Sequence, residues 1–124
     1  MLEAEKRLEE AHGKFAFFGL FLRADSPGKW DVVAAADWIQ QDPVAGLRQV
    51  AEEVQRTLSP EHLLAISRVV VLPPDDPRLL AVSTAVRTEH TPAEVEAGSF
   101  DGMKLEQAVV LTSRPPGNGQ GEGR

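Results

Sequence analysis

The apolar residues of this chain are most concentrated between residues 14 and 36, where two apolar runs flank a turn. Four of the five phenylalanines lie in the first run, residues 14–23, in which odd and even positions alike are apolar. Because successive side chains of a strand point to opposite faces, this strand must be covered on both sides. Ser26-Pro27-Gly28-Lys29 has the proline and glycine of a type II turn, and residues 30–36 return from it. We predict an antiparallel hairpin at or near the centre of a sheet.

Alternation also assigns the side chains of this hairpin to faces. In the first strand, Phe15 shares a face with Phe17 and Phe21, whereas Phe18 lies on the opposite face. The return strand is apolar on both faces from Val32 onward. The hairpin is therefore expected to contribute to two separate apolar layers.

Helical patterns lie on either side of this hairpin. Residues 2–12 predict a short helix with a thin apolar stripe, which a partner could complete. Three later helices begin with a capping side chain followed by proline, a combination that favours a helix N-terminus: Asp42-Pro43, Ser59-Pro60 and Asp76-Pro77. Each pair predicts where a helix starts to within a residue or two.

The helix after Asp42 has an apolar stripe at spacings of three and four residues, formed by Val44, Leu47, Val50, Val54 and Leu58. The same spacing places Glu53 in water. In the next short helix, Leu64 is expected to pack inward. Residues 68–72, which are apolar from Val69 onward, then predict a buried, central strand that ends before Pro73.

The last third of the chain predicts a second hairpin. Asp101-Gly102 is a pair favoured in two-residue hairpin turns, and it separates strands at residues 94–100 and 103–112. In the second of these strands, Leu105 and Val109 are assigned to one face. Residues 113–124 are rich in glycine and proline and have little to bury, so we predict a disordered tail.

These elements predict an α/β fold, more fully a mixed α+β fold, in a single small domain at residues 1–112. Its sheet has about five strands in mixed directions, built from two β-hairpins and one central strand, with helices on both faces. The connection between the first hairpin and the strand at residues 68–72 is long enough for a parallel crossover.

Composition narrows the classes of function. The net charge of −6 makes this an acidic protein and disfavours non-specific binding of nucleic acid. The absence of cysteine excludes disulfides and thiolate chemistry. The longest apolar run is eight residues, residues 15–22, too short to cross a membrane, and the charged N-terminus is unlike a signal peptide. We expect a cytoplasmic protein that does not enter the membrane.

Acidic residues provide the main catalytic hypothesis. Asp75 and Asp76 follow a predicted strand, a position where ligands gather in α/β sheets, and carboxylates there could hold Mg²⁺. With Asp31 or Glu106 as a further acid, they would form a metal-assisted phosphoester hydrolase. The plainer interpretation is that Asp76 caps a helix and Asp75 complements the helix dipole.

Other reactive constellations have no support in the sequence. The three histidines, His12, His62 and His90, lack zinc-site spacing. The serines lack a nucleophile elbow, and no phosphate-binding glycine loop occurs. Glu89-His90 is an acid–base pair without a predicted substrate. We therefore expect no cofactor and no resident metal.

Two aromatic sites suggest partners. Arg23 and Trp30 flank the first hairpin turn, and a basic, aromatic tip could bind a nucleic acid base, which would make the chain a nucleic-acid accessory protein. Trp38 and Ile39 follow the return strand, and tryptophan is enriched at the centres of interfaces. The favoured hypothesis is a non-catalytic protein-association module, a homodimer in the first instance, with exposed sheet edges available for pairing.

Overall fold

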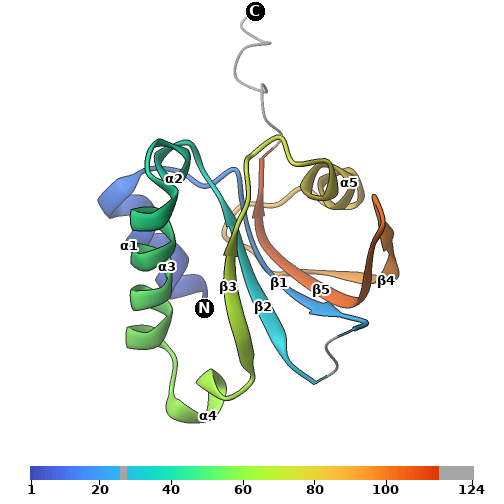
Figure 1. Cartoon of the computed structure of the whole chain (residues 1–124), viewed down its shortest axis with the longest axis horizontal. Helices are drawn as coiled ribbons and strands as arrows, with labels where there is room; N and C mark the ends of the chain where they lie inside the picture. Colours follow the sequence, from blue (N-terminus) through green and yellow to red (C-terminus); the bar gives the residue numbers. More distant parts are fainter. Residues whose placement is uncertain (26–27, 115–124) are drawn as a thin grey trace, which may run out of the picture.

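The computed structural model describes residues 1–25 and 28–114, and its centre is one five-stranded mixed sheet (Figure 1). The strands are β1 Phe17–Arg23, β2 Trp30–Ala35, β3 Ile66–Val71, β4 Ala93–Phe100 and β5 Met103–Ser113. Their order across the sheet is β3-β2-β1-β5-β4. The pair β2–β3 is parallel and the other pairs are antiparallel. The predicted mixed α+β fold with a five-stranded sheet is confirmed, and the first hairpin lies at the centre.

Helices cover both faces of the sheet, as the sequence predicts. The helices are α1 Leu2–His12, α2 Asp37–Gln41, α3 Pro43–Thr57, α4 Pro60–Leu63 and α5 Pro77–Ala85. Helices α1 and α3 lie on one face, and α5 lies on the other (Figure 1). Helix α2 has no counterpart in the sequence-based prediction. Within the described residues, no helix combines the length and apolar character needed to span a bilayer.

The two-sided apolar strand β1 joins two separate cores. Phe18 packs in the core beneath α1 and α3, whereas Phe17 and Phe21 pack in the core beneath α5. Phe15 differs from its predicted face, because it packs against Phe18 with the ring centroids 4.8 Å apart. Phe15 precedes the first residue of β1. The side-chain alternation of a strand therefore does not determine which face the Phe15 side chain packs on.

The position of β3 corrects the prediction of a buried, central strand. β3 is at one end of the sheet, and its residues are exposed or half-buried. A run of valines indicates high strand propensity. It does not indicate whether a strand other than β2 will pair with β3.

The three capping pairs start helices as the sequence predicts. The side chain of Asp42 accepts a hydrogen bond from the backbone N–H of Ala45 at 3.2 Å, and Ser59 caps α4 in the same way. The Oδ1 atom of Asp76 accepts from the backbone N–H of Arg78 at 2.9 Å. In each helix proline is at the first position, where its missing N–H costs no hydrogen bond.

The apolar stripe of α3 is only partly buried. Val50 and Val54 lie in the core, but Val44 is 69% exposed. Glu53, predicted to face water, is buried and forms ion pairs with Arg7 of α1 and with Arg56. Basic residues from two helices meet at this position, so burial of the carboxylate is compensated. Leu64, predicted to pack inward, is 75% exposed, because α4 ends one residue before it.

The second hairpin is confirmed, with Asp101 and Gly102 in the left-handed region at φ 52° and 86°. Leu105 and Val109 pack on opposite faces rather than the same one. The reason is a register shift of β5 against β1 between Leu22 and Arg23, since an extra residue reverses the alternation.

The boundary of the predicted tail also shifts. β5 continues through Ser113, and Arg114 forms ion pairs with two glutamates. The predicted tail beyond Arg114 and the first two residues of the predicted type II turn, Ser26 and Pro27, lie outside the described residues.

Candidate functional site

The free edge of β3 is the first element of the candidate site. The backbone N–H of Leu72 donates to the carbonyl of Ala34 on β2. Alternate residues of a strand bond to the same neighbour, so the N–H groups of Val69 and Val71 point away from β2. No strand among residues 1–25 and 28–114 lies beyond them. This edge therefore presents unpaired donors and acceptors that can bind another strand.

A groove of about 580 Å³ runs beside this edge, between α3 and β3. Its apolar lining consists of Leu47, Ala51, Val54, Leu63, Ile66 and Val69. Leu47 and Ala51 are four residues apart and lie on one side of α3, so they form a continuous apolar strip. The groove thus adds apolar area to the free edge.

Most of the large apolar side chains that stay exposed belong to, or directly follow, the helices on one face of the sheet. Four such side chains stand out in the described part of the chain, and three of them belong to α3 or directly follow α4. They are Val44 at 69%, Leu47 at 36% and Leu64 at 75% exposure. The fourth, Leu80 at 38%, lies on α5 across the sheet. Of these side chains, Leu47 lines the groove itself and gives it exposed apolar area.

The opposite edge of the sheet differs in character. On β4, Glu94 and Glu96 are exposed, and charged side chains on an edge strand oppose pairing with another chain. β3 has a single charged residue, Arg68. The two edges are therefore not equivalent, and β3 is the one available for association.

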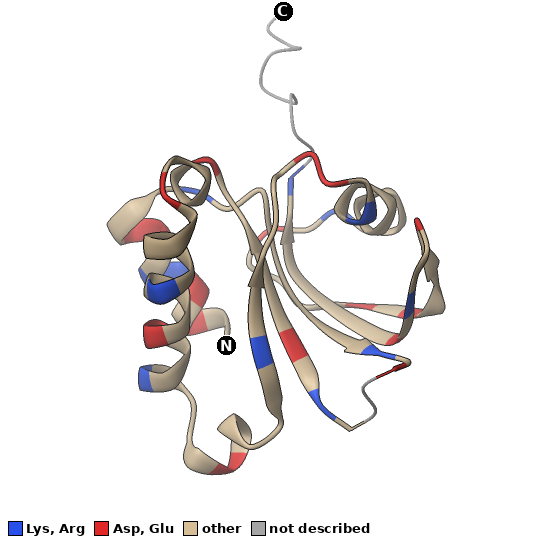
Figure 2. Ribbon diagram, viewed as in Figure 1, with Lys and Arg blue, Asp and Glu red and all other residues tan. Residues whose placement is uncertain are grey.

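Asp31, a candidate from the sequence, neutralises the charge of Arg68. The acidic position on β2 and the basic position on β3 lie side by side (Figure 2), and the Nε atom of Arg68 is 3.2 Å from Asp31 Oδ2. Arg23 approaches the same oxygen at 3.6 Å. Asp31 is 4% exposed. Two arginines compensate this buried carboxylate, so its contacts are those of a structural ion pair.

The four candidate acids do not come together. Asp31 pairs with the start of β3, whereas Asp75 and Asp76 follow the end of β3. Asp75 is exposed, and Asp76 caps α5 and binds the guanidinium of Arg78. Glu106 is exposed on β5, separated from β2 by β1. Within the described residues, no group of three histidine, cysteine or acidic side chains is arranged to hold a metal ion.

A second groove, of about 490 Å³, lies where the end of β1 meets the first turn of α5 and the β4–β5 turn. Three basic side chains line it: Arg23, Arg78 and Lys104. Arg23 and Arg78 are already paired with aspartates. The positive field that an anionic ligand requires is thus largely cancelled.

The predicted partner residues also have internal contacts. The Nε1 atom of Trp38 donates to the carbonyl of Gly13 at 3.0 Å, and its ring stacks on His12 at 4.7 Å between centroids. Ile39 is completely buried. Trp30 is half-buried at the start of β2. In this conformation Trp38 and Ile39 close the end of the core near α1.

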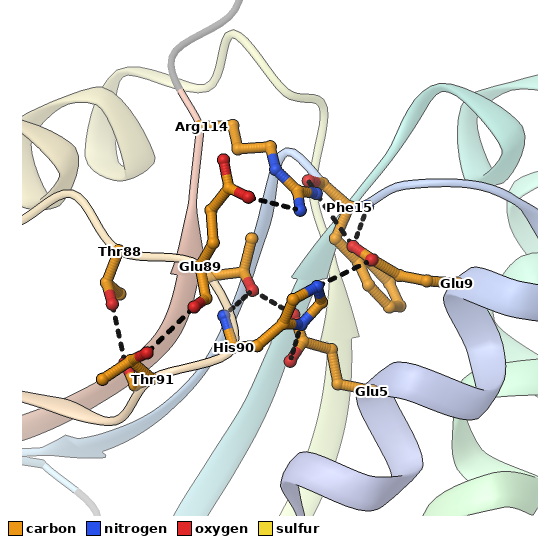
Figure 3. A network of polar contacts seen from close by, with 9 residues as sticks. Glu5, Glu9, Phe15, Thr88, Glu89, His90, Thr91 and Arg114 are labelled. Atoms are coloured by element: carbon orange, nitrogen blue, oxygen red, sulfur yellow. Dashed lines mark hydrogen bonds and ion pairs between the residues drawn. The ribbon is translucent and has the colours of Figure 1, made fainter.

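A polar network absent from the sequence-based candidates joins α1 to the end of β5 and to the loop before β4 (Figure 3). Its members are Glu5 and Glu9 of α1, Thr112 and Arg114 at the end of β5, and His90 in the loop between α5 and β4. Glu5 is fully buried and accepts a hydrogen bond from the hydroxyl of Thr112. Arg114 also binds Glu89 and lowers the pKa of that carboxyl by hydrogen bonding to it.

A β-bulge accounts for part of this geometry. The register of β5 against β1 shifts between the partners of Phe18 and Gly19, which are Thr112 and Val110. The extra residue lets Thr112 turn toward α1, because bulges re-aim side chains. Glu5 and Thr112 are 107 residues apart in sequence, so no local spacing could predict their contact. The one local signal was the adjacent pair Glu89-His90.

Comparison with protein-family models, with curated proteins and with solved structures found no match for this chain.

Proposed function

We propose that this protein is a non-catalytic protein-association module and that it forms a homodimer through the free edge of β3. The observation that supports this proposal is the open strand edge beside the apolar groove of α3 and β3. Antiparallel pairing of two β3 strands satisfies the outward N–H and C=O groups of both copies. It joins the two sheets into one.

The same symmetry brings the α3 helices together. A two-fold axis perpendicular to the sheet keeps each face of the sheet on the same side in both copies. The two α3 helices then lie on one side of the joined sheet, next to the new strand pair. Leu47 and Ala51 of one copy face those of the other. The exposed apolar strip of α3 becomes an interface core, and water is excluded from it.

Charge favours a second copy at this surface rather than elsewhere. The whole chain has a net charge of −6, so two copies repel each other over much of their surface. In the described groove lining, Arg68 is the single charged side chain, and Asp31 neutralises it. Two copies can approach here without bringing like charges into contact.

The expected affinity is modest. Each copy contributes a strand of six residues and one side of a helix. The buried area is therefore near the lower end of the range for stable complexes, about 1,200 Å² in total. We expect a dissociation constant on the order of micromolar. Sedimentation equilibrium across the micromolar range is the appropriate measurement.

Two leucines on opposite faces give a matched test of the surface. Leu47 and Leu80 are 36% and 38% exposed, and both lie on helices. We expect Leu47→Lys to abolish dimerisation, because a lysine and its two-fold copy would meet in the interface. Leu80→Lys, the control, should leave the dimer intact. Equal effects of the two substitutions would contradict the assigned surface.

The strand edge can be tested separately. The backbone N–H of Val71 points away from β2, as does that of Val69, and the Val71 side chain is half-buried. Val71→Pro removes an outward donor while leaving the bonds to β2 in place, so it should weaken the dimer. In hydrogen exchange, the amides of Val69 and Val71 should be slower at high protein concentration than at low concentration. A strict monomer up to roughly 100 µM would overturn the homodimer.

A further inference from the structure

His90 lies between two carboxylates of α1 (Figure 3). Its Nδ1 atom is 3.1 Å from Glu5 Oε1, and its Nε2 atom is 3.2 Å from Glu9 Oε1. The backbone N–H of His90 donates to the hydroxyl of Thr112 at 3.1 Å. That hydroxyl in turn donates to Glu5. The backbone of His90 is held in the left-handed region at φ 51°, which costs energy for a residue other than glycine.

The two ring contacts require a proton that a neutral imidazole lacks. A neutral imidazole has one N–H donor and one acceptor nitrogen, whereas the imidazolium has two donors. Both nitrogens of His90 face carboxylate oxygens, which accept hydrogen bonds when ionised. The observed arrangement is therefore fully bonded only when the network holds one additional proton. Without that proton, a nitrogen lone pair faces a carboxylate.

The surrounding charges make this proton important for Glu5 in particular. Glu9 has a second cation, because Arg114 Nη1 is 2.8 Å from Glu9 Oε2. Glu5 is fully buried, and its other described partner is the neutral hydroxyl of Thr112. Glu89, beside His90 in the chain, is bound by Arg114, and Lys14 lies close enough to Glu89 to act on its charge. Loss of the His90 proton would thus leave the buried carboxylate of Glu5 without a cation.

We propose that His90 is a proton-dependent clasp that holds α1 against the sheet. The helix needs such a contact, because its buried residues are only Ala4, Glu5 and Leu8. Besides the Arg114–Glu9 pair, α1 is linked to α3 by the Arg7–Glu53 pair at 3.5 Å, and the half-exposed Arg7 side chain limits what this long pair contributes. Protonated His90 keeps α1 docked, and neutral His90 allows it to open.

Opening of α1 would expose apolar residues next to it, among them Phe15 and Phe18 in the same core. Histidine side chains ordinarily change charge roughly between pH 5 and 8, so this is the range in which the clasp is tested. Docking is strongest at the acidic end of this window and weakens as the pH rises. The proposal does not depend on dimerisation, and it can be tested in the Leu47→Lys background.

Hydrogen exchange of α1, measured relative to α5 in the same molecule, tests the clasp. Protection of α1 should fall by about tenfold between roughly pH 5.5 and 8 after correction for intrinsic exchange, since a charge-assisted hydrogen bond is lost. The His90→Gln variant should show low protection of α1 at both pH values. Constant relative protection in the wild type would overturn the proposal, as would an unaltered pH profile in His90→Gln.

Three further measurements separate the clasp from a merely structural role. Glu5→Gln removes the buried charge and can bond to neutral imidazole, so α1 should stay docked at high pH. His62→Gln is the control, because His62 lies in α4; it should retain the wild-type profile. If His90→Gln does not fold, the ¹⁵N chemical shifts of the His90 ring in the wild type test the proposal instead. Two protonated nitrogens at acidic pH support the clasp, and a single tautomer throughout contradicts it.

Discussion

Gly19 shows how one missing side chain lets two central strands approach. A Cβ atom at this position would lie 2.9 Å from the carbonyl oxygen of Val109 and 3.3 Å from the Cα of Val110. Both are backbone atoms of β5, in the middle of the sheet, and they cannot move cheaply. We expect Gly19→Ala to lower the free energy of unfolding by about 1–3 kcal/mol, as measured by urea denaturation.

Gly98 is the control for this substitution, because it is also a strand glycine. Its added Cβ would meet the ring of Phe100 at 3.5 Å, an ordinary van der Waals contact. Gly98→Ala should be neutral or slightly stabilising, since alanine reduces the freedom of the unfolded chain. If both variants were as stable as the wild type, the close approach at Gly19 would not limit the packing.

At the scale of the element, the start of α5 depends on one carboxylate. Asp76 accepts from the backbone N–H of Arg78 at 2.9 Å and from its guanidinium Nε and Nη2 atoms at 3.0 and 2.9 Å. Hydrogen bonding from the Arg78 side chain lowers the pKa of Asp76 below its ordinary value. The charged form therefore stabilises the fold above the unfolded-state pKa, roughly pH 4. This contribution is lost as the pH falls through the lower, folded-state pKa.

We expect Asp76→Ala to lower the free energy of unfolding by about 1 kcal/mol at neutral pH, the usual value of an N-cap. The difference from the wild type should shrink below about pH 4. Asp76→Asn is the matched variant, because asparagine caps a helix but does not titrate. A difference between wild type and Asp76→Asn that persisted unchanged in acid would contradict the role assigned to the Arg78–Asp76 pair.

At the scale of the whole molecule, the acidic charge acts against self-association. Two copies with a net charge of −6 each repel at long range, and salt screens that repulsion. We expect dimerisation to strengthen several-fold when NaCl is raised from about 0.05 to 0.5 M. Binding of nucleic acid would weaken over the same range, because condensed counterions are released. Sedimentation of the protein alone and with a labelled oligonucleotide separates the two.

Much of the fold could be predicted from local patterns. The capping pairs at Asp42, Ser59 and Asp76 act within one helical turn, so they can be recognised from the sequence. The alternation of β1 likewise acts between neighbours, and it correctly indicated a sheet covered on both faces. Less of the candidate site could be predicted: exposed sheet edges were expected in general, but β3 was predicted to be central, and the groove beside it was not predicted.

The sequence by itself determined most of the elements, the starts of three helices and the two-sided burial of β1, because hydrogen bonds within a turn and side-chain alternation depend on residues close in the chain. Only the tertiary structure decided that β3 lies at an edge, that Glu53 is buried, and that His90 meets Glu5. Each of these depends on which segments become neighbours after folding. That choice is made by the packing of whole helices against whole strands, and short sequence spacings do not record it.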